Sequence, residues 1–204
     1  MKNVTVSIDY PSEPLNRTTT LFRIVVAIPI LILISSVSGS AIMLGSGKNA
    51  TAVAAAGGTL VLGPLLMIVF RQKYPRWWFD WNLALTQFSA RVSTYMMLMT
   101  DKYPSTDEEQ SVHLNIEYPD ATKLNRWLPL VKWFLAIPHY IALLFLSIGV
   151  IFSVLISWFA ILFTGKYPES LFRYNEGVLR WSTNVSAYAL LLTTDQYPPF
   201  SLKA

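Results

Sequence analysis

The sequence predicts an all-α membrane protein built from two tandem repeats, and three observations lead to this prediction. Hydrophobic residues make up 53% of the 204 residues and charged residues only 14%, well below the roughly 25% charged residues of typical soluble domains. Long apolar stretches separate the charged segments, and the mean hydropathy is +0.41. Short motifs of the first half return in the same order in the second half. Each repeat is expected to hold a short strand, a transmembrane helical hairpin and an amphipathic interfacial helix.

Five pairs of matching motifs define the repeats. The pairs are residues 6–11 with 114–119, 15–17 with 124–126, 28–29 with 137–138, 73–75 with 166–168, and 100–104 with 194–198. Matches in a constant order indicate a tandem duplication. The first repeat covers residues 1–105, a linker covers 106–111, and the second repeat covers 112–204.

Each repeat opens with a predicted strand. Val4, Val6 and Ile8 alternate with polar residues, and the pattern stops at Pro11. This period of two is typical of a half-buried strand. Residues 112–118 repeat the pattern and stop at Pro119. The two strands could pair with each other or with residues 190–193.

The apolar stretches predict two spans in each repeat. Residues 21–44 and 51–70 are each long enough for a transmembrane helix, which needs about 20 residues. Residues 128–163 would form a helix of about 54 Å, too long for a hydrocarbon core of about 30 Å. We therefore expect a hairpin that turns near residues 147–149. Gly57 and Gly58 favour close helix packing, either within the first hairpin or between molecules.

The placement of charge predicts the topology. With two spans in each repeat, the termini and the linker lie on one face together with all 12 acidic and all but one of the 16 basic residues. Lys48 alone is opposite. The positive-inside rule places the charged face in the cytoplasm of a multi-pass plasma-membrane protein. Membrane lipids are the expected partners, and the basic residues near the span ends could attract anionic headgroups.

A predicted amphipathic helix follows the spans in each repeat, at about residues 78–99 and 171–192. Apolar residues recur there at steps of three and four, which is one stripe of an α-helix. We expect both helices to lie in the membrane interface. The alternative is that each helix forms a third span, which would bury an arginine in the membrane at a cost of at least about 2.5 kcal/mol. An odd number of spans in each repeat would invert the second repeat relative to the first, as in transporters. The expected interfacial anchors are Trp77, Trp78, Trp81, Arg91, Tyr174, Arg180 and Trp181.

Each repeat ends in an Asp-x-Tyr-Pro motif. The simplest interpretation is a turn in which the Asp carboxylate accepts a hydrogen bond from the amide two residues later, while Pro fixes the backbone. The alternative is a site shared by the two carboxylates. The turn residues are Asp101, Tyr103 and Pro104 in the first repeat, and Asp195, Tyr197 and Pro198 in the second.

No motif in the sequence predicts catalysis or cofactor binding. His139 lies in an apolar run, where an ionisable residue is a candidate for function, but a histidine that packs between helices is the simpler interpretation. The chain has no cysteine, and His113 has no neighbour at metal-ligand spacing. Phosphate-binding loops, nucleophile elbows and zinc-binding helices are absent. We expect no catalytic residue, no cofactor, no metal and no nucleic-acid partner.

The second repeat resembles a known membrane family. Residues 166–168, Asn175, Gly177 and residues 194–200 fit the pattern of a prokaryotic family catalogued as domain of unknown function 4389. The first repeat departs from it, since Ala84 and Gln87 replace Gly177 and Arg180. The resemblance implies a membrane protein and names no reaction.

The expected function is that of a non-catalytic structural or accessory subunit in a membrane assembly, either a homo-oligomer or a larger complex. The alternative is a small transporter, channel or lipid-handling protein with a pathway between the repeats. An enzyme that acts on lipid at the interface is a third possibility, although no set of catalytic residues supports it.

Overall fold

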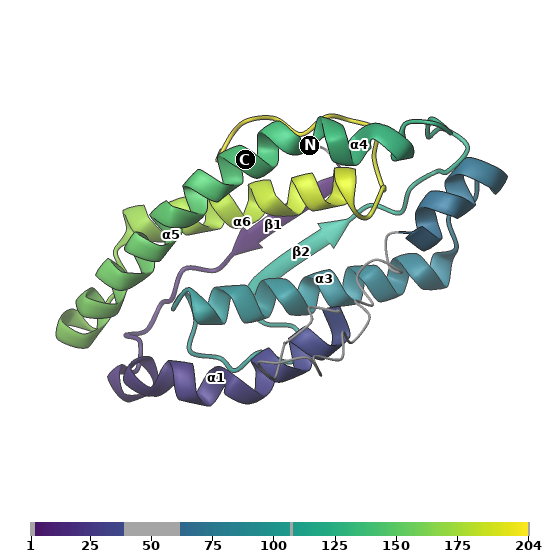
Figure 1. Cartoon of the computed structure of the whole chain (residues 1–204). Helices are drawn as coiled ribbons and strands as arrows, with labels where there is room; N and C mark the ends of the chain where they lie inside the picture. The colour runs from purple at the N-terminus through teal and green to yellow at the C-terminus, as the bar shows by residue number, and fades with distance from the viewer. Residues whose placement is uncertain (1–2, 39–61, 107, 204) are drawn as a thin grey trace, which may run out of the picture.

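The computed structural model describes residues 3–38, 62–106 and 108–203, and it is mostly helical. Figure 1 shows how the elements are arranged. A short apolar helix, Leu62–Arg71, ends in the π-helical turn η1. In chain order the elements are β1 (Val4–Ile8), α1 (Arg17–Ser38), η1 (Met67–Arg71), α3 (Arg76–Met96), β2 (Val112–Ile116), α4 (Pro129–Leu135), α5 (Ile137–Thr164) and α6 (Glu169–Ala189).

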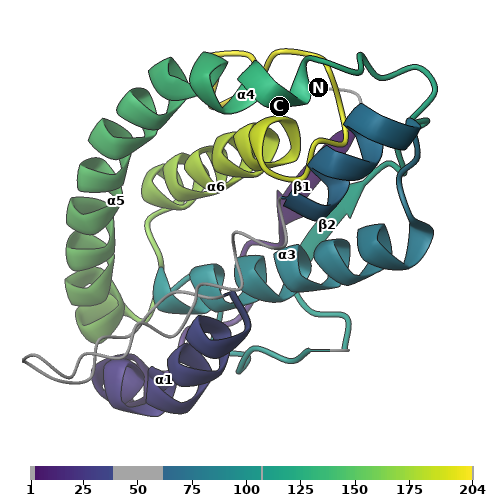
Figure 2. The ribbon, with the colours of Figure 1, turned by 45° about the vertical axis from the view of Figure 1, so that its right-hand side comes forward.

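The elements form three layers. β1 and β2 pair with each other in an antiparallel two-stranded sheet, with Val6 opposite Leu114. α6 packs on β1 and α3 packs on β2, whereas α1 and α5 lie outside these two helices (Figures 1 and 2). Each strand therefore contacts the amphipathic helix of the other half of the chain. The layers run from the sheet, through α3 and α6, to the apolar helices α1 and α5.

The two predicted strands are confirmed. Side chains alternate between buried and exposed along both of them. Their buried faces join the main hydrophobic core together with Phe79 of α3 and Phe172 of α6. The opposite face of the sheet carries polar side chains. The exposed residues there are Thr5, Ser7, His113 and Asn115.

Side chains of the amphipathic helices cover both edges of the sheet. Arg180 Nε of α6 donates a hydrogen bond to the carbonyl of Val6, at 3.0 Å. At the equivalent position of α3, Gln87 Nε2 donates to the carbonyl of Leu114, at 2.9 Å. An uncovered strand edge is a template for pairing with another chain. These contacts occupy that surface in both halves.

α5 is one continuous helix, so the predicted hairpin near residues 147–149 is wrong. Gly149 permits a close approach, because a Cβ atom there would collide with the hydroxyl of Tyr174. That hydroxyl donates to the carbonyl of Leu146, at 2.8 Å. The glycine thus serves the packing of α6 against α5 and makes no turn. The helix is about 42 Å long at 1.5 Å per residue, and it bows around α6 (Figure 2).

The helix boundaries differ in part from the predicted spans. By length and composition, Arg17–Ile34 and Ile137–Thr164 could cross a membrane. The preceding helix α4 is separate, since Pro138 stands in the first turn of α5 and lacks the N–H needed to continue a helix. Of the predicted span 51–70, only the part from Leu62 onward is described. Lys48, Gly57 and Gly58 lie outside the described residues.

We expect Gly149→Ala to lower the free energy of unfolding by about 1–3 kcal/mol, the usual cost of overpacking. The added methyl group would displace Tyr174 from Leu146. Chemical denaturation in detergent measures the change.

In a Tyr174→Leu background the same glycine substitution should cost much less, because the colliding hydroxyl is gone. Equal costs in both backgrounds would show that the close approach does not constrain the helix pair.

Candidate functional site

Two fully buried cations are the main polar feature of the apolar layer. Arg23 of α1 is 2% exposed and Lys132 of α4 is 0% exposed. A buried charge is strongly unfavourable unless it is paired and hydrogen-bonded. Arg23 forms an ion pair with Asp101. Lys132 forms one with Asp195, at 2.7 Å between Nζ and Oδ1.

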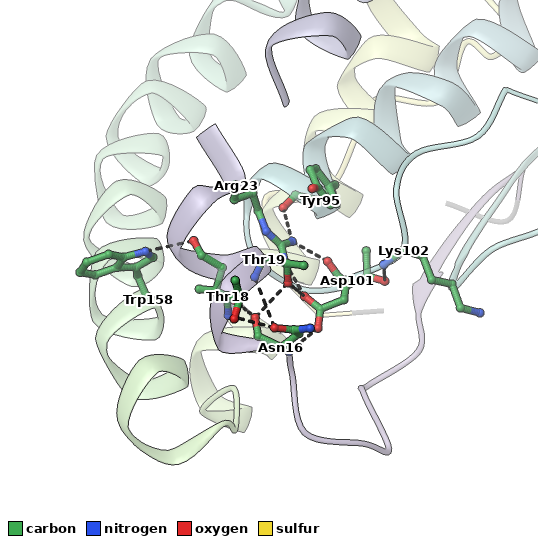
Figure 3. Close-up of polar contacts among 10 residues, drawn as sticks. Asn16, Thr18, Thr19, Arg23, Tyr95, Asp101, Lys102 and Trp158 are labelled. Carbon is green, nitrogen blue, oxygen red and sulfur yellow. Dashed lines mark hydrogen bonds and ion pairs between the residues drawn. The ribbon is translucent and has the colours of Figure 1, made fainter. Parts of the chain in front are cut away.

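The first cluster surrounds the guanidinium group of Arg23 (Figure 3). Its Nη1 donates to the carbonyls of Tyr95, at 2.8 Å, and of Thr100, at 2.5 Å. The same group lies over the ring of Tyr95, 4.3 Å from the centroid, in a favourable cation–π contact. Arg23 therefore joins α1 to the end of α3 and to the segment that carries Asp101.

The second cluster repeats this arrangement with a lysine. Lys132 Nζ donates to the carbonyl of Thr194, at 2.7 Å. It also lies 5.2 Å from the ring centroid of Tyr188. By the order of the repeated motifs, Tyr188 and Thr194 correspond to Tyr95 and Thr100. Both halves thus use one cation to hold the apolar helix against the end of the amphipathic helix.

Each carboxylate also holds the start of an apolar helix. The amide of Asn16 donates to Asp101 Oδ2, at 2.6 Å, and the amide of Asn125 donates to Asp195 Oδ2, also at 2.6 Å. The Asn16 side chain accepts a bond from the amide of Thr18, at 2.9 Å. This is the contact of a helix N-cap. The Asn125 side chain accepts the equivalent bond from Trp127, at 2.9 Å.

The predicted turn role of the two aspartates is therefore corrected. Their carboxylates bind residues far away in the chain rather than the amide two residues later. Threonines make the local contact instead: Thr100 Oγ1 accepts from the amide of Lys102, at 3.2 Å, and Thr194 Oγ1 accepts from that of Gln196, at 3.1 Å.

The turns themselves face outward. The tyrosines of the two motifs, Tyr103 and Tyr197, are 43% and 45% exposed. Their neighbours Pro104 and Pro198 are buried. Each aspartate belongs to its own cluster, and no partner named for Asp101 is also a partner of Asp195.

Four tyrosines join the halves reciprocally. The hydroxyl of Tyr10 donates to the carbonyl of Tyr167, and that of Tyr118 donates to the carbonyl of Tyr74, both at 2.5 Å. The hydroxyl of Tyr74 in turn donates to the carbonyl of Leu191, at 2.7 Å. Burial raises the pKa of Tyr74 and of Tyr167. Both hydroxyls therefore stay protonated and remain donors at physiological pH.

The predicted tryptophan anchors lie in different surroundings. Trp77 and Trp81 are 67% and 55% exposed, whereas Trp78 is half-buried and packs against Gly63. Trp181 is buried, and its Nε1 donates to Nδ1 of His139, at 3.1 Å. The polar end of Trp181 therefore faces a buried imidazole rather than water.

His139 packs between helices and the C-terminal segment. It is fully buried, and the ring of Phe200 stacks on its imidazole with 4.0 Å between centroids. The Trp181 ring meets Phe200 edge-on. The imidazole, indole and phenyl rings together fix the C-terminal segment against α5 and α6.

Two arginines of the amphipathic helices, Arg91 and Arg180, bind backbone carbonyls. Arg91 is buried, and its Nη1 donates to the carbonyl of Ser105, at 2.9 Å. Arg180 binds Val6, as described above, and forms an ion pair of 2.8 Å with buried Glu176. Glu176 is not among the residues predicted from the sequence, although a Glu–Arg spacing of four is a known helix pair. The depth of both helices in a membrane stays a prediction.

The charged groups of the two ion-pair clusters bind the chain itself. Nη1 and Nη2 of Arg23 and Nζ of Lys132 are directed to carbonyls and carboxylates of the chain. Within residues 3–38, 62–106 and 108–203, no group of three or more His, Asp or Glu side chains is placed to hold a metal ion. The arrangement can cap helices and hold them together. These clusters are not among the sites predicted from the sequence, although Arg23 and Lys132 occupy matching positions seven residues after Asn16 and Asn125.

Comparison with protein families gives one match. Residues 127–201 fit the model of a family described as Domain of unknown function (DUF4389). The second half of the chain resembles this family. The resemblance expected from the sequence is thus confirmed. No curated protein and no solved structure matches the chain.

The region that resembles DUF4389 holds one complete ion-pair cluster. It contains Lys132 and Asp195, and also the rings of His139, Trp181 and Phe200. The reciprocal partners of this region, β1 and the Tyr10 segment, lie outside it. The matched region is therefore completed by contacts from the first half.

We expect Asp195→Ala and Asp101→Ala each to lower the free energy of unfolding by about 3–5 kcal/mol, because each leaves a buried cation without its counter-charge. The matched control is Asp80→Ala, since Asp80 pairs with Arg76 on the surface and such pairs contribute about 1 kcal/mol or less. Denaturation in detergent compares the three variants. Similar losses for Asp80 and Asp195 would contradict a special role for the buried pairs.

We expect Tyr10→Phe and Tyr118→Phe to have similar effects, because the two hydroxyls make equivalent bonds. Each variant should lose about 0.5–1.5 kcal/mol, the usual net value of one hydrogen bond. Thermal unfolding of the single and double variants measures this, and additive losses are expected since the sites are distinct. An effect at only one site would contradict their equivalence.

Proposed function

We propose that this protein is a non-catalytic integral membrane protein and acts as a structural or accessory subunit of a membrane assembly. The assembly is a homo-oligomer or a larger complex at the plasma membrane. The main support is the segregation of surfaces. One side of the molecule is an apolar helical layer, and the opposite side is a polar sheet.

The apolar layer carries a continuous exposed stripe. α5 contains no Asp, Glu, Lys or Arg. Its stripe is far more extensive than the apolar patches of soluble monomers, and α1 adds to it with Leu21, Phe22, Ile24 and Val25. The exposed large side chains of α5 are Ile137, Tyr140, Ile141, Leu144, Phe145, Ile148, Ile151, Phe152, Leu155, Ile156, Phe159 and Phe163.

The polar side supports a cytoplasmic orientation. The exposed pair of Asp9 and His113 lies there, at 3.0 Å. The excess of basic residues outside the apolar helices favours the cytoplasm under the positive-inside rule. Exposed Arg17, Arg76 and Lys166 border the apolar layer and supply positive charge for anionic headgroups.

A structural role agrees with how the chain uses its polar groups. The buried cations and carboxylates bind one another and the backbone, which stabilises the fold. A tandem-repeat architecture, in which each half completes the other, gives a rigid body suited to support partner subunits. The alternative, a transporter or lipid-handling protein, requires a pathway between the repeats. The buried side chains of Tyr74 and Tyr167 lie at the junction of the halves, where such a pathway would have to pass.

The first test is purification of the full chain in native-lipid particles. We expect the protein to resist alkaline extraction from membranes. In native-lipid particles we expect it to purify in a complex with further copies or with a partner of defined stoichiometry. Particle mass and crosslinking measure the assembly. A monomer without any partner would contradict the proposal, and a specific lipid bound at the junction of the halves would favour the lipid-handling alternative.

A further inference from the structure

We propose that α5 lies along the membrane within one leaflet and does not cross the bilayer. The acyl chains of that single leaflet then cover its exposed apolar stripe. This inference rests on the proposed membrane location. It concerns how the described part of the chain is embedded.

α5, α6 and β1 run side by side. His139 of α5 contacts Trp181 of α6, and seven residues along each helix Leu146 contacts Tyr174. The two helices are therefore antiparallel neighbours over this stretch. On the other side of α6, Arg180 binds the carbonyl of Val6. Val6 thus lies level with the beginning of α5.

The chain after β1 continues along α5 to its far end. The amide of Leu15 donates to the carbonyl of Gly165, which follows the last residue of α5, at 2.9 Å. Arg17 Nη2 donates to the carbonyl of Phe163, at 3.3 Å. From Val6 to Leu15 the chain therefore covers most of the length of the helix. Figure 1 shows the same course, with the N-terminal strand and the segment after it following α5.

This accompanying segment is polar and exposed. Between Val6 and Leu15 it carries the exposed residues Asp9, Ser12 and Glu13. It lies outside any helix and bends at Ser12 and Glu13. If α5 crossed the bilayer, this segment would lie at the depth of the hydrocarbon core. Lipid-exposed irregular backbone does not occur at that depth, and intramembrane carboxylates are strongly unfavourable.

An orientation along the surface removes this conflict. The apolar stripe of α5 then faces the acyl chains, and the sheet with the Asp9 segment faces water. Isolated interfacial helices need a charged face of their own, but α6 covers the inner face of α5 and the sheet lies beyond it. Exposed Trp127 and Trp133 flank the start of α5, where aromatic side chains suit the headgroup level.

The depth of three positions along α5 tests the inference. Phe145, Phe152 and Phe159 are 67%, 60% and 54% exposed and share one face, since they are spaced by heptads. The chain has no native cysteine, so Phe145→Cys, Phe152→Cys and Phe159→Cys can each carry one spin label. The full-length variants are placed in vesicles of phosphatidylcholine with anionic phosphatidylglycerol, and collisional accessibility gives the depth.

For a helix along the surface we expect three depths within a few ångströms of one another, all in the same leaflet. For a crossing helix the depth changes by about 21 Å between the first and third positions, at 1.5 Å per residue. That gradient would overturn the inference while leaving the membrane location intact. If all three labels instead contact water and the protein does not float with the vesicles, the proposed membrane location itself fails. Ser7→Cys on the outer face of the sheet is the control for a water-exposed label.

Thiol accessibility supplies an independent measurement. Thr122 precedes α4 and Ser170 follows α5, and both are exposed. For a helix along the surface, Thr122→Cys and Ser170→Cys react with an impermeant reagent from the same side. Reaction from opposite sides of intact cells would overturn the inference. Equal melting temperatures of the variants and the wild type confirm that the labelled proteins are folded.

Discussion

A positive charge inside an apolar helix is the constraint on which the rest of the structure depends. Arg23 and Lys132 need counter-charges, and the chain supplies them from the segments that follow α3 and α6. Each pair therefore fixes where an amphipathic helix ends relative to the apolar helix beside it. The same carboxylates bind the amides of Asn16 and Asn125, so they also set where the apolar segments begin. Removing water from these pairs is unfavourable by itself, but the surrounding carbonyls and tyrosine rings offset part of that cost.

Reciprocal contacts between the halves make the sheet a part of both. β1 lies against α6 and β2 against α3, and Tyr10 and Tyr118 bind carbonyls in the opposite half. A two-stranded sheet is marginally stable alone and needs helices packed on it. Here the helices supply the hydrophobic face and also the polar groups of Gln87 and Arg180 for the outer edges. Different side chains at equivalent positions perform the same task, because both are long donors that reach a carbonyl.

Local patterns predicted local structure well. The alternation in residues 4–8 and 112–116 predicted the strands, and the three–four spacing predicted α3 and α6 within a few residues. The predictions that were wrong concern residues whose roles depend on contacts with distant parts of the chain. Gly149 had the composition of a turn, but its role depends on Tyr174 of another helix. Asp101 and Asp195 looked like turn residues, since their partners lie 63 to 85 residues away in the chain. Trp181 had the position of an interfacial anchor, and only the fold places His139 and Phe200 around it.

The exchange of strands between the halves sets the order in which the chain can fold during synthesis. β1 is among the first residues made, and its packing partner α6 is among the last, with 174 positions between Val6 and Arg180. Contacts between residues so far apart form slowly, because the entropy of closing the loop must be overcome first. Until the ribosome has released α6, the apolar face of β1 lacks the helix that packs on it. The first half therefore stays incompletely folded during that interval. A chaperone or the membrane surface would shield the apolar side chains of Val4, Val6 and Ile8 from water until α6 is made.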